Sequence, residues 1–165
     1  ESSREFFRLG LLIYGEELGY RSRNPNKYLN DALTLEEALL LEPDNSRYAF
    51  YLAQSYVHAR EWEKALFWYE KRAKMEGDAE EVFWSLYCIA CLYDDLKRPS
   101  SEVIAAYSKA YCYKPTQAEP LYRLSLHVKN RPFLAKLVKD YAKKIPIPES
   151  AARQQLWVYE ELQKL

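Results

Sequence analysis

The chain has 165 residues, 48% of them hydrophobic and 29% charged, which argues against a disordered chain and fits a single domain. Its 24 Lys and Arg residues balance its 24 Asp and Glu residues, so neither nucleic acid nor an anionic membrane is expected as the main partner. The 4 glycines are too few for dinucleotide-binding folds, Walker-type phosphate loops or hairpin-rich sheets.

Helical periodicity and capping signals follow one another along the chain. In chain order, helices are expected over 4–18, 26–41, 46–59, 62–75, 79–96, 101–113, 117–129, 132–144 and 150–164. Within the first of these, 9–14 also fits a strand of a larger sheet. Asp78 and Thr116 each open a capping box, and Ser100 or Ser101 is expected to cap the helix that follows Pro99. No alternating apolar pattern is long enough for a strand elsewhere, so the sequence predicts an all-α fold.

The helical pattern repeats with a period close to 34 residues. Asp31, Ala65, Val103 and Leu137 align at spacings of 34, 38 and 34, and Leu35, Tyr69, Tyr107 and Tyr141 follow four residues later. This period, with a small residue and then a bulky aromatic, is typical of tetratricopeptide (TPR) repeats. We therefore expect a TPR-like helical-hairpin solenoid, a right-handed superhelix closed by a C-terminal helix. The four extra residues of the middle unit are expected in its first helix, within 80–96.

Several short runs carry a more specific signal. They lie at 21–31, 41–56, 65–72, 75–77, 80–83 and 118–122, and they include FYLAQSY at 50–56 and YEKR at 69–72. The runs resemble the TPR region that follows the catalytic domain in many bacterial and viral family 2 glycosyltransferases. The resemblance covers about 14–148, and more weakly 156–162. It divides the chain into an N-terminal helix and junction at 1–25, interpreted as the remnant of a catalytic-domain edge, repeats at 26–148 and a C-terminal capping helix at 149–165.

The catalytic domain of that family binds a nucleotide sugar through an Asp-x-Asp metal motif. This sequence has no Asp-x-Asp, and Tyr14-Gly15 stands where the family usually has a His-Gly pair before the repeats. The resemblance therefore implies a non-catalytic interaction module associated with, or derived from, such an enzyme, with a catalytic domain in cis as one partner. Two alternatives stay open: the chain is the C-terminal part of an active glycosyltransferase, or it is an oligomerisation scaffold.

The residues usually associated with catalysis or metal binding form no motif. Cys88-x-x-Cys91 falls in the middle of an expected helix among apolar residues, which favours packing over a redox or zinc site. His58 and His127 stand in no HExxH pair or local triad. We expect no catalytic residue, no metal and no cofactor in this chain.

The first helix of each repeat is expected to line a concave groove, and aromatic and Arg side chains there are typical of peptide-binding surfaces. The candidate groove residues are Arg47, Phe50, Tyr51, Gln54, His58, Tyr122 and Arg123. They predict a protein or peptide partner, a second copy of the chain included. Two other interpretations stay open: Phe50 packs against the next helix, or the apolar stripe at 156–162 fills the groove.

The cysteine count and the hydropathy pattern bear on location. Three cysteines and no N-terminal apolar signal segment fit a reducing, cytoplasmic compartment. No run of about 18 uncharged apolar residues predicts a membrane span. Because the chain begins at Glu1 rather than Met, we interpret it as a fragment, natural or prepared.

Overall fold

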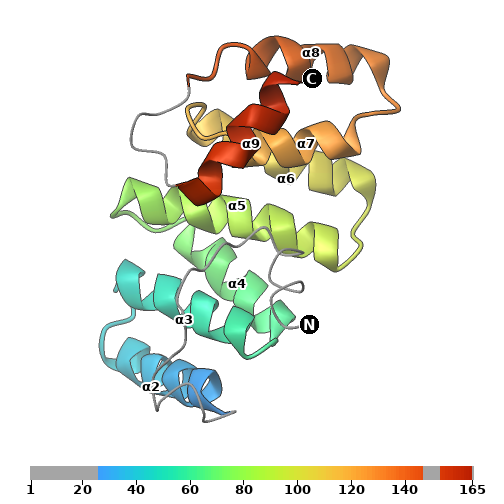
Figure 1. Cartoon of the computed structure of the whole chain (residues 1–165). Coiled ribbons are helices and arrows are strands. Elements are labelled where there is room, and N and C mark those ends of the chain that lie inside the picture. Colours follow the sequence, from blue (N-terminus) through green and yellow to red (C-terminus); the bar gives the residue numbers. More distant parts are fainter. Residues whose placement is uncertain (1–25, 147–152, 165) are drawn as a thin grey trace. The chain divides into compact units, whose positions relative to one another are not determined.

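The computed structural model of this chain describes residues 26–146 and 153–164 (Figure 1). These ranges contain eight helices and no strand, so the prediction of an all-α fold is confirmed for them. The helices are α2 (Lys27–Leu41), α3 (Ser46–His58), α4 (Trp62–Arg72), α5 (Ala79–Asp95), α6 (Ser100–Tyr113), α7 (Glu119–His127), α8 (Pro132–Ala142) and α9 (Arg153–Gln163). The helix expected at 4–18 lies outside the described residues.

Two of the helices begin on side-chain caps. The Asn45 side chain accepts a hydrogen bond from the backbone N–H of Tyr48 at the start of α3. Asp78 Oδ1 accepts the backbone N–H groups of Glu80 and Glu81, at 2.8 and 3.1 Å, which confirms Asp78 as the cap of α5. At 17 residues, α5 is the longest of the described helices, as the extra turn of the middle repeat predicts.

Two other expected caps are wrong. α6 follows Pro99, which occupies the N-cap position, so Ser100 lies inside the first turn and makes no capping bond. α7 begins only at Glu119, because 114–117 forms a separate turn in which the Gln117 N–H donates to the Lys114 carbonyl. Pro120 then needs no hydrogen-bond acceptor in the first turn of α7. Thr116 therefore does not cap this helix.

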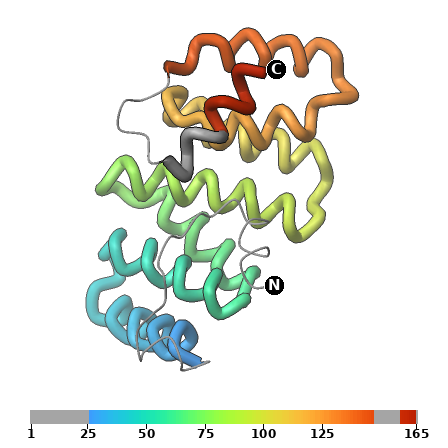
Figure 2. The backbone as a smooth tube through the Cα atoms, in the orientation of Figure 1, coloured from blue at the N-terminus to red at the C-terminus, as the bar shows by residue number. Residues whose placement is uncertain are grey.

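The chain divides into two compact units between Leu92 and Tyr93, within α5. In the first unit, α3 packs against both α2 and α4 (Figures 1 and 2). Ala65 and Tyr69 of α4 are fully buried, as the repeat pattern predicts for the helix contact and the gap-filling aromatic. Buried apolar residues of α2 and α3 contribute to this core, namely Ala32, Leu39, Ala49, Phe50, Leu52, Ala53, Tyr56 and Val57. The N-terminal part of α5 adds Val82, Phe83, Leu86, Tyr87, Cys88, Ala90, Cys91 and Leu92.

In the second unit, α7 packs against α6 and α8, and α9 packs against α7 and α8. Its core contains Val103, Tyr107, Ala110, Leu121, Val128, Val138, Ala142, Val158, Tyr159 and Leu162. Val103 and Tyr107 hold the buried repeat positions, as predicted. None of the described helices in either unit is long and apolar enough to cross a lipid bilayer.

The repeat register is wrong at both ends of the array. Leu137 is 42% exposed and Tyr141 is 43% exposed, whereas Val138 and Ala142, one residue later, are buried. In α2 the buried residue is likewise Ala32 rather than Asp31. Successive residues of a helix point about 100° apart, so a shift of one residue places Val138 and Ala142 of α8, rather than Leu137 and Tyr141, toward the interior. The Tyr141 ring lies instead against Tyr111, with 5.9 Å between the ring centroids.

Candidate functional site

The exposed face of α3 holds a pair of side chains one turn apart. Arg47 Nη2 donates to Tyr51 Oη at 3.1 Å, and the guanidinium carbon lies 5.5 Å from the centre of the Tyr51 ring. This hydrogen bond is the main reason that the pKa of Arg47 lies above its ordinary value. An arginine side chain is charged at every physiological pH. Both side chains are exposed, Tyr51 at 40%. The pair therefore presents a positive charge and an aromatic ring on one surface.

Phe50 does not lie on that surface. It is 8% exposed, and its ring packs edge-on against Tyr69 at 6.2 Å and beside Tyr51 at 5.9 Å. Of the two interpretations left open for Phe50, packing against the next helix is therefore the one observed. The buried Phe50 ring thus contacts both Tyr51 on the surface and Tyr69 in the core.

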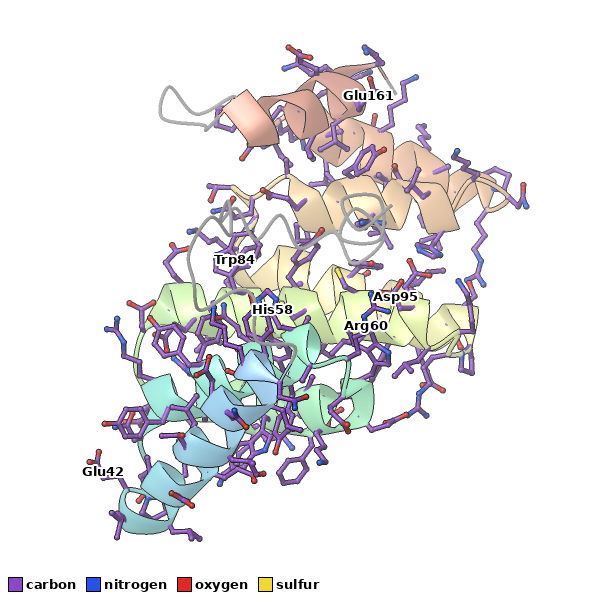
Figure 3. The ribbon with its side chains drawn as sticks, turned by 60° about the horizontal axis from the view of Figure 1, so that its bottom comes forward. Glu42, His58, Arg60, Trp84, Asp95 and Glu161 are labelled. Carbon is purple, nitrogen blue, oxygen red and sulfur yellow. The ribbon has the colours of Figure 1, made fainter. Side chains whose placement is uncertain are left out.

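The other candidates on α3 lie further along the same helix. Gln54 is half-buried one turn beyond Phe50. His58, labelled in Figure 3, stacks on Tyr28 of α2 with 4.3 Å between ring centroids and 16° between ring planes. His58 is thus engaged in the α2–α3 contact, two turns from Tyr51. Of the five candidates on this helix, the structure brings Arg47, Phe50 and Tyr51 into one cluster.

Tyr122 and Arg123 lie on α7 in the second unit, where both are half-buried. The carbonyl oxygen of Tyr122 accepts a hydrogen bond from Ser125 Oγ at 2.6 Å. These two residues belong to the second unit, whereas the cluster on α3 belongs to the first.

The sequence patterns missed three polar contacts between helices. Tyr56 Oη donates to Glu36 of α2 at 2.6 Å, Arg72 pairs with Glu81 at 3.1 Å, and His127 Nε2 lies 3.0 Å from Asp94 Oδ2. The partners are 20, 9 and 33 residues apart in sequence. Only the Arg72 pair lies close in sequence: Arg72 ends the YEKR run, and Glu81 follows the expected Asp78 cap of the next helix. The other two pairs depend on how helices meet, which no local spacing reveals.

Glu119 is a buried carboxylate that the sequence patterns did not predict. It is 7% exposed, and neither carboxylate oxygen has a hydrogen-bond partner among the described residues. Burial raises the pKa of Glu119 above its ordinary value, while its own backbone N–H, the nearby Lys114 and the backbone N–H of Ala118 act in the opposite direction.

The cysteines of the Cys88-x-x-Cys91 motif are both buried in α5, and neither forms a disulfide. Burial raises the pKa of the Cys88 thiol, which disfavours the reactive thiolate. Both side chains therefore lie in the core, the position that packing requires. Within the described ranges, no group of three or more His, Cys, Asp and Glu side chains is arranged to hold a metal ion.

No model of a known protein family matches this sequence, and no curated protein matches it.

Proposed function

We propose that this chain is a non-catalytic TPR-like interaction module that binds a protein or peptide partner through the Arg47–Tyr51 surface of α3. The observation that carries the proposal is the exposed pairing of a charged guanidinium with an aromatic ring, which also contacts the buried Phe50. Tyr and Arg are the residue types that contribute most to binding energy at protein interfaces. A ring whose position is already fixed loses little conformational entropy when a partner binds.

The stacking of neighbouring helices supports the solenoid part of this proposal. In the first unit, α3 lies between α2 and α4, and in the second, α7 lies between α6 and α8. Repeat proteins are built in this way, each helix contacting its neighbours in sequence. One face of α3 is then used for the core and the opposite face remains for a partner.

The relation to family 2 glycosyltransferases is also proposed, on the resemblance of the sequence runs. The two most specific runs, FYLAQSY and YEKR, contribute buried side chains, among them Leu52, Tyr56, Tyr69 and Arg72. The resemblance thus concerns residues that form the scaffold, and it supports kinship of the repeat region rather than sugar transfer by this chain. Calorimetry with UDP-glucose and Mn²⁺ is expected to show no binding, whereas metal-dependent binding would favour the catalytic alternative.

The test of the binding surface starts from a random peptide library displayed on phage and selected on the full chain. Tyr51→Ala and Arg47→Ala are each expected to weaken the selected peptides by about 1–3 kcal/mol. Phe67→Ala is the matched control, because Phe67 is a 60% exposed aromatic on α4 of the same unit. Equal affinity of the Tyr51→Ala and Phe67→Ala variants, or a library without binders, would contradict the proposal.

A further inference from the structure

A cavity of about 360 Å³ lies between α7 and α8, wholly within the second unit. Its apolar lining comes from Val128, Ala135 and Val138, of which the two valines are buried. The polar lining comes from Ser125 and from three lysines, Lys129, Lys136 and Lys139. We call this cavity the lysine pocket. Its volume lies in the range of pockets that bind a small ligand or a large side chain.

The three lysines are exposed, and none of them has an ion-pair partner among the described residues. They belong to a segment, 119–146, that holds seven Lys and Arg residues against two carboxylates, one of which is the buried Glu119. The chain as a whole has a formal net charge of zero, so positive charge is concentrated around this pocket. Like charges that converge without a counter-ion favour an anionic ligand.

We propose that the lysine pocket binds an acidic peptide segment of a partner protein, one that carries an apolar side chain between carboxylates. The apolar side chain would rest on Val128 and Val138, and the flanking carboxylates would meet the three lysines. The apolar lining favours such a peptide over a nucleic acid, whose phosphates need no apolar floor. This proposal does not depend on the role of Arg47 and Tyr51, which belong to the first unit.

The experiment measures fluorescence anisotropy of a fluorescein-labelled peptide, Glu-Asp-Leu-Glu-Asp, on the full chain. A second peptide replaces the leucine by serine, and labelled oligo(dT) represents nucleic acid. The test variant is Lys136→Gln/Lys139→Gln. The matched control is Lys143→Gln/Lys144→Gln, which removes the same charge just beyond α8, at lysines that do not line the pocket. Thermal melts of both variants verify that they fold.

We expect the leucine peptide to bind the wild-type chain, and the Lys136→Gln/Lys139→Gln variant to bind it about tenfold more weakly. The control variant should lose about threefold at most, and the serine peptide should bind the wild type several-fold more weakly than the leucine peptide. An equal loss in both double variants, equal binding of the two peptides, tighter binding of oligo(dT), or no binding at about 1 mM would each overturn the proposal. Because Tyr51→Ala should leave this binding unchanged, failure here does not affect the proposal for α3.

Discussion

Arg72 is a charged residue with no exposed surface, and its guanidinium organises the connection between α4 and α5. Its Nε and Nη2 donate to Glu81, its Nη1 donates to the carbonyl of Met75, and its Nη2 also donates to the carbonyl of Asp78. Gly77 completes the turn at a φ of 125°, and a Cβ at this position would come within 2.7 Å of Ser46 Oγ. A buried guanidinium is tolerated because its donors find these acceptors.

Replacing Arg72 by Met would keep most of the side-chain volume but remove every one of these hydrogen bonds. Glu81 would then lose its ion-pair partner, and two backbone carbonyls would lose their donor. The free energy of unfolding, measured by urea denaturation, is expected to fall by about 3 kcal/mol. Lys74→Met, at an exposed position just beyond α4, is expected to change it by less than about 0.5 kcal/mol. Equal stabilities of the two variants would contradict this role of Arg72.

Glu119 is expected to make stability depend on pH. Its pKa in the folded state is raised above the ordinary value of 4.5, mainly by burial, so the folded state holds the proton more tightly than the unfolded chain. The free energy of unfolding should therefore fall as the pH rises from about 4.5 through the raised pKa. The charged groups that bear on this carboxyl are Lys114 and, when ionised, Tyr159 of α9.

Glu119→Gln removes the buried charge, so at pH 7 it is expected to be more stable than the wild type by about 1 kcal/mol. At pH 4 the difference should disappear, because the wild-type carboxyl is then protonated. Glu102→Gln is the control: Glu102 is an exposed carboxylate in the first turn of α6, and its loss should lower stability slightly at pH 7. Guanidinium denaturation at both pH values gives the comparison, and a wild-type advantage over Glu119→Gln at pH 7 would show the expectation to be wrong.

At the scale of single helices, the sequence predicted most of what depends on local periodicity. The predicted bounds of α2 and α3 agree with the structure to within one residue at each end, and Ala65, Tyr69, Val103 and Tyr107 are buried as the repeat requires. The register of α8 could not be predicted in this way, because Leu137 and Val138 are both apolar and the repeat alignment favours the wrong one. The candidate site on α3 was only partly predicted, since the same periodicity placed Arg47, Tyr51 and the buried Phe50 on one face.

Ala65 and Leu137 occupy equivalent positions in the repeat alignment, and so they provide a matched pair of substitutions. Ala65→Trp forces an indole into a fully buried position of α4 and is expected to cost about 1–3 kcal/mol or more. Leu137→Trp changes the equivalent repeat position of α8, but Leu137 is 42% exposed, so the cost should stay under about 0.5 kcal/mol. Chemical denaturation of both variants tests the register. Similar losses of stability would mean that Leu137 occupies the helix contact after all.

At the scale of the whole molecule, stability is expected to vary along the chain, because the helices of each unit pack mainly against their neighbours in sequence. A local defect in such an arrangement loosens the adjacent helices before it reaches distant ones. Ala65→Trp should therefore increase amide hydrogen exchange in α3 and α4, whereas Val103→Trp, at the equivalent buried position of α6, should increase it in α6 and α7.

Amide hydrogen exchange, measured by mass spectrometry on peptides from each helix, distinguishes such local loosening from unfolding of the chain as a single cooperative unit. In the Ala65→Trp variant, protection against exchange should fall about tenfold or more in peptides from α3. Under the same conditions, peptides from α7 and α8 should keep the protection that they have in the wild type. Val103→Trp should give the reverse pattern, and so serves as the control for a general effect of a buried tryptophan. If either substitution lowered protection equally in all helices, the two units would unfold together, and the division between Leu92 and Tyr93 would have no counterpart in the energetics.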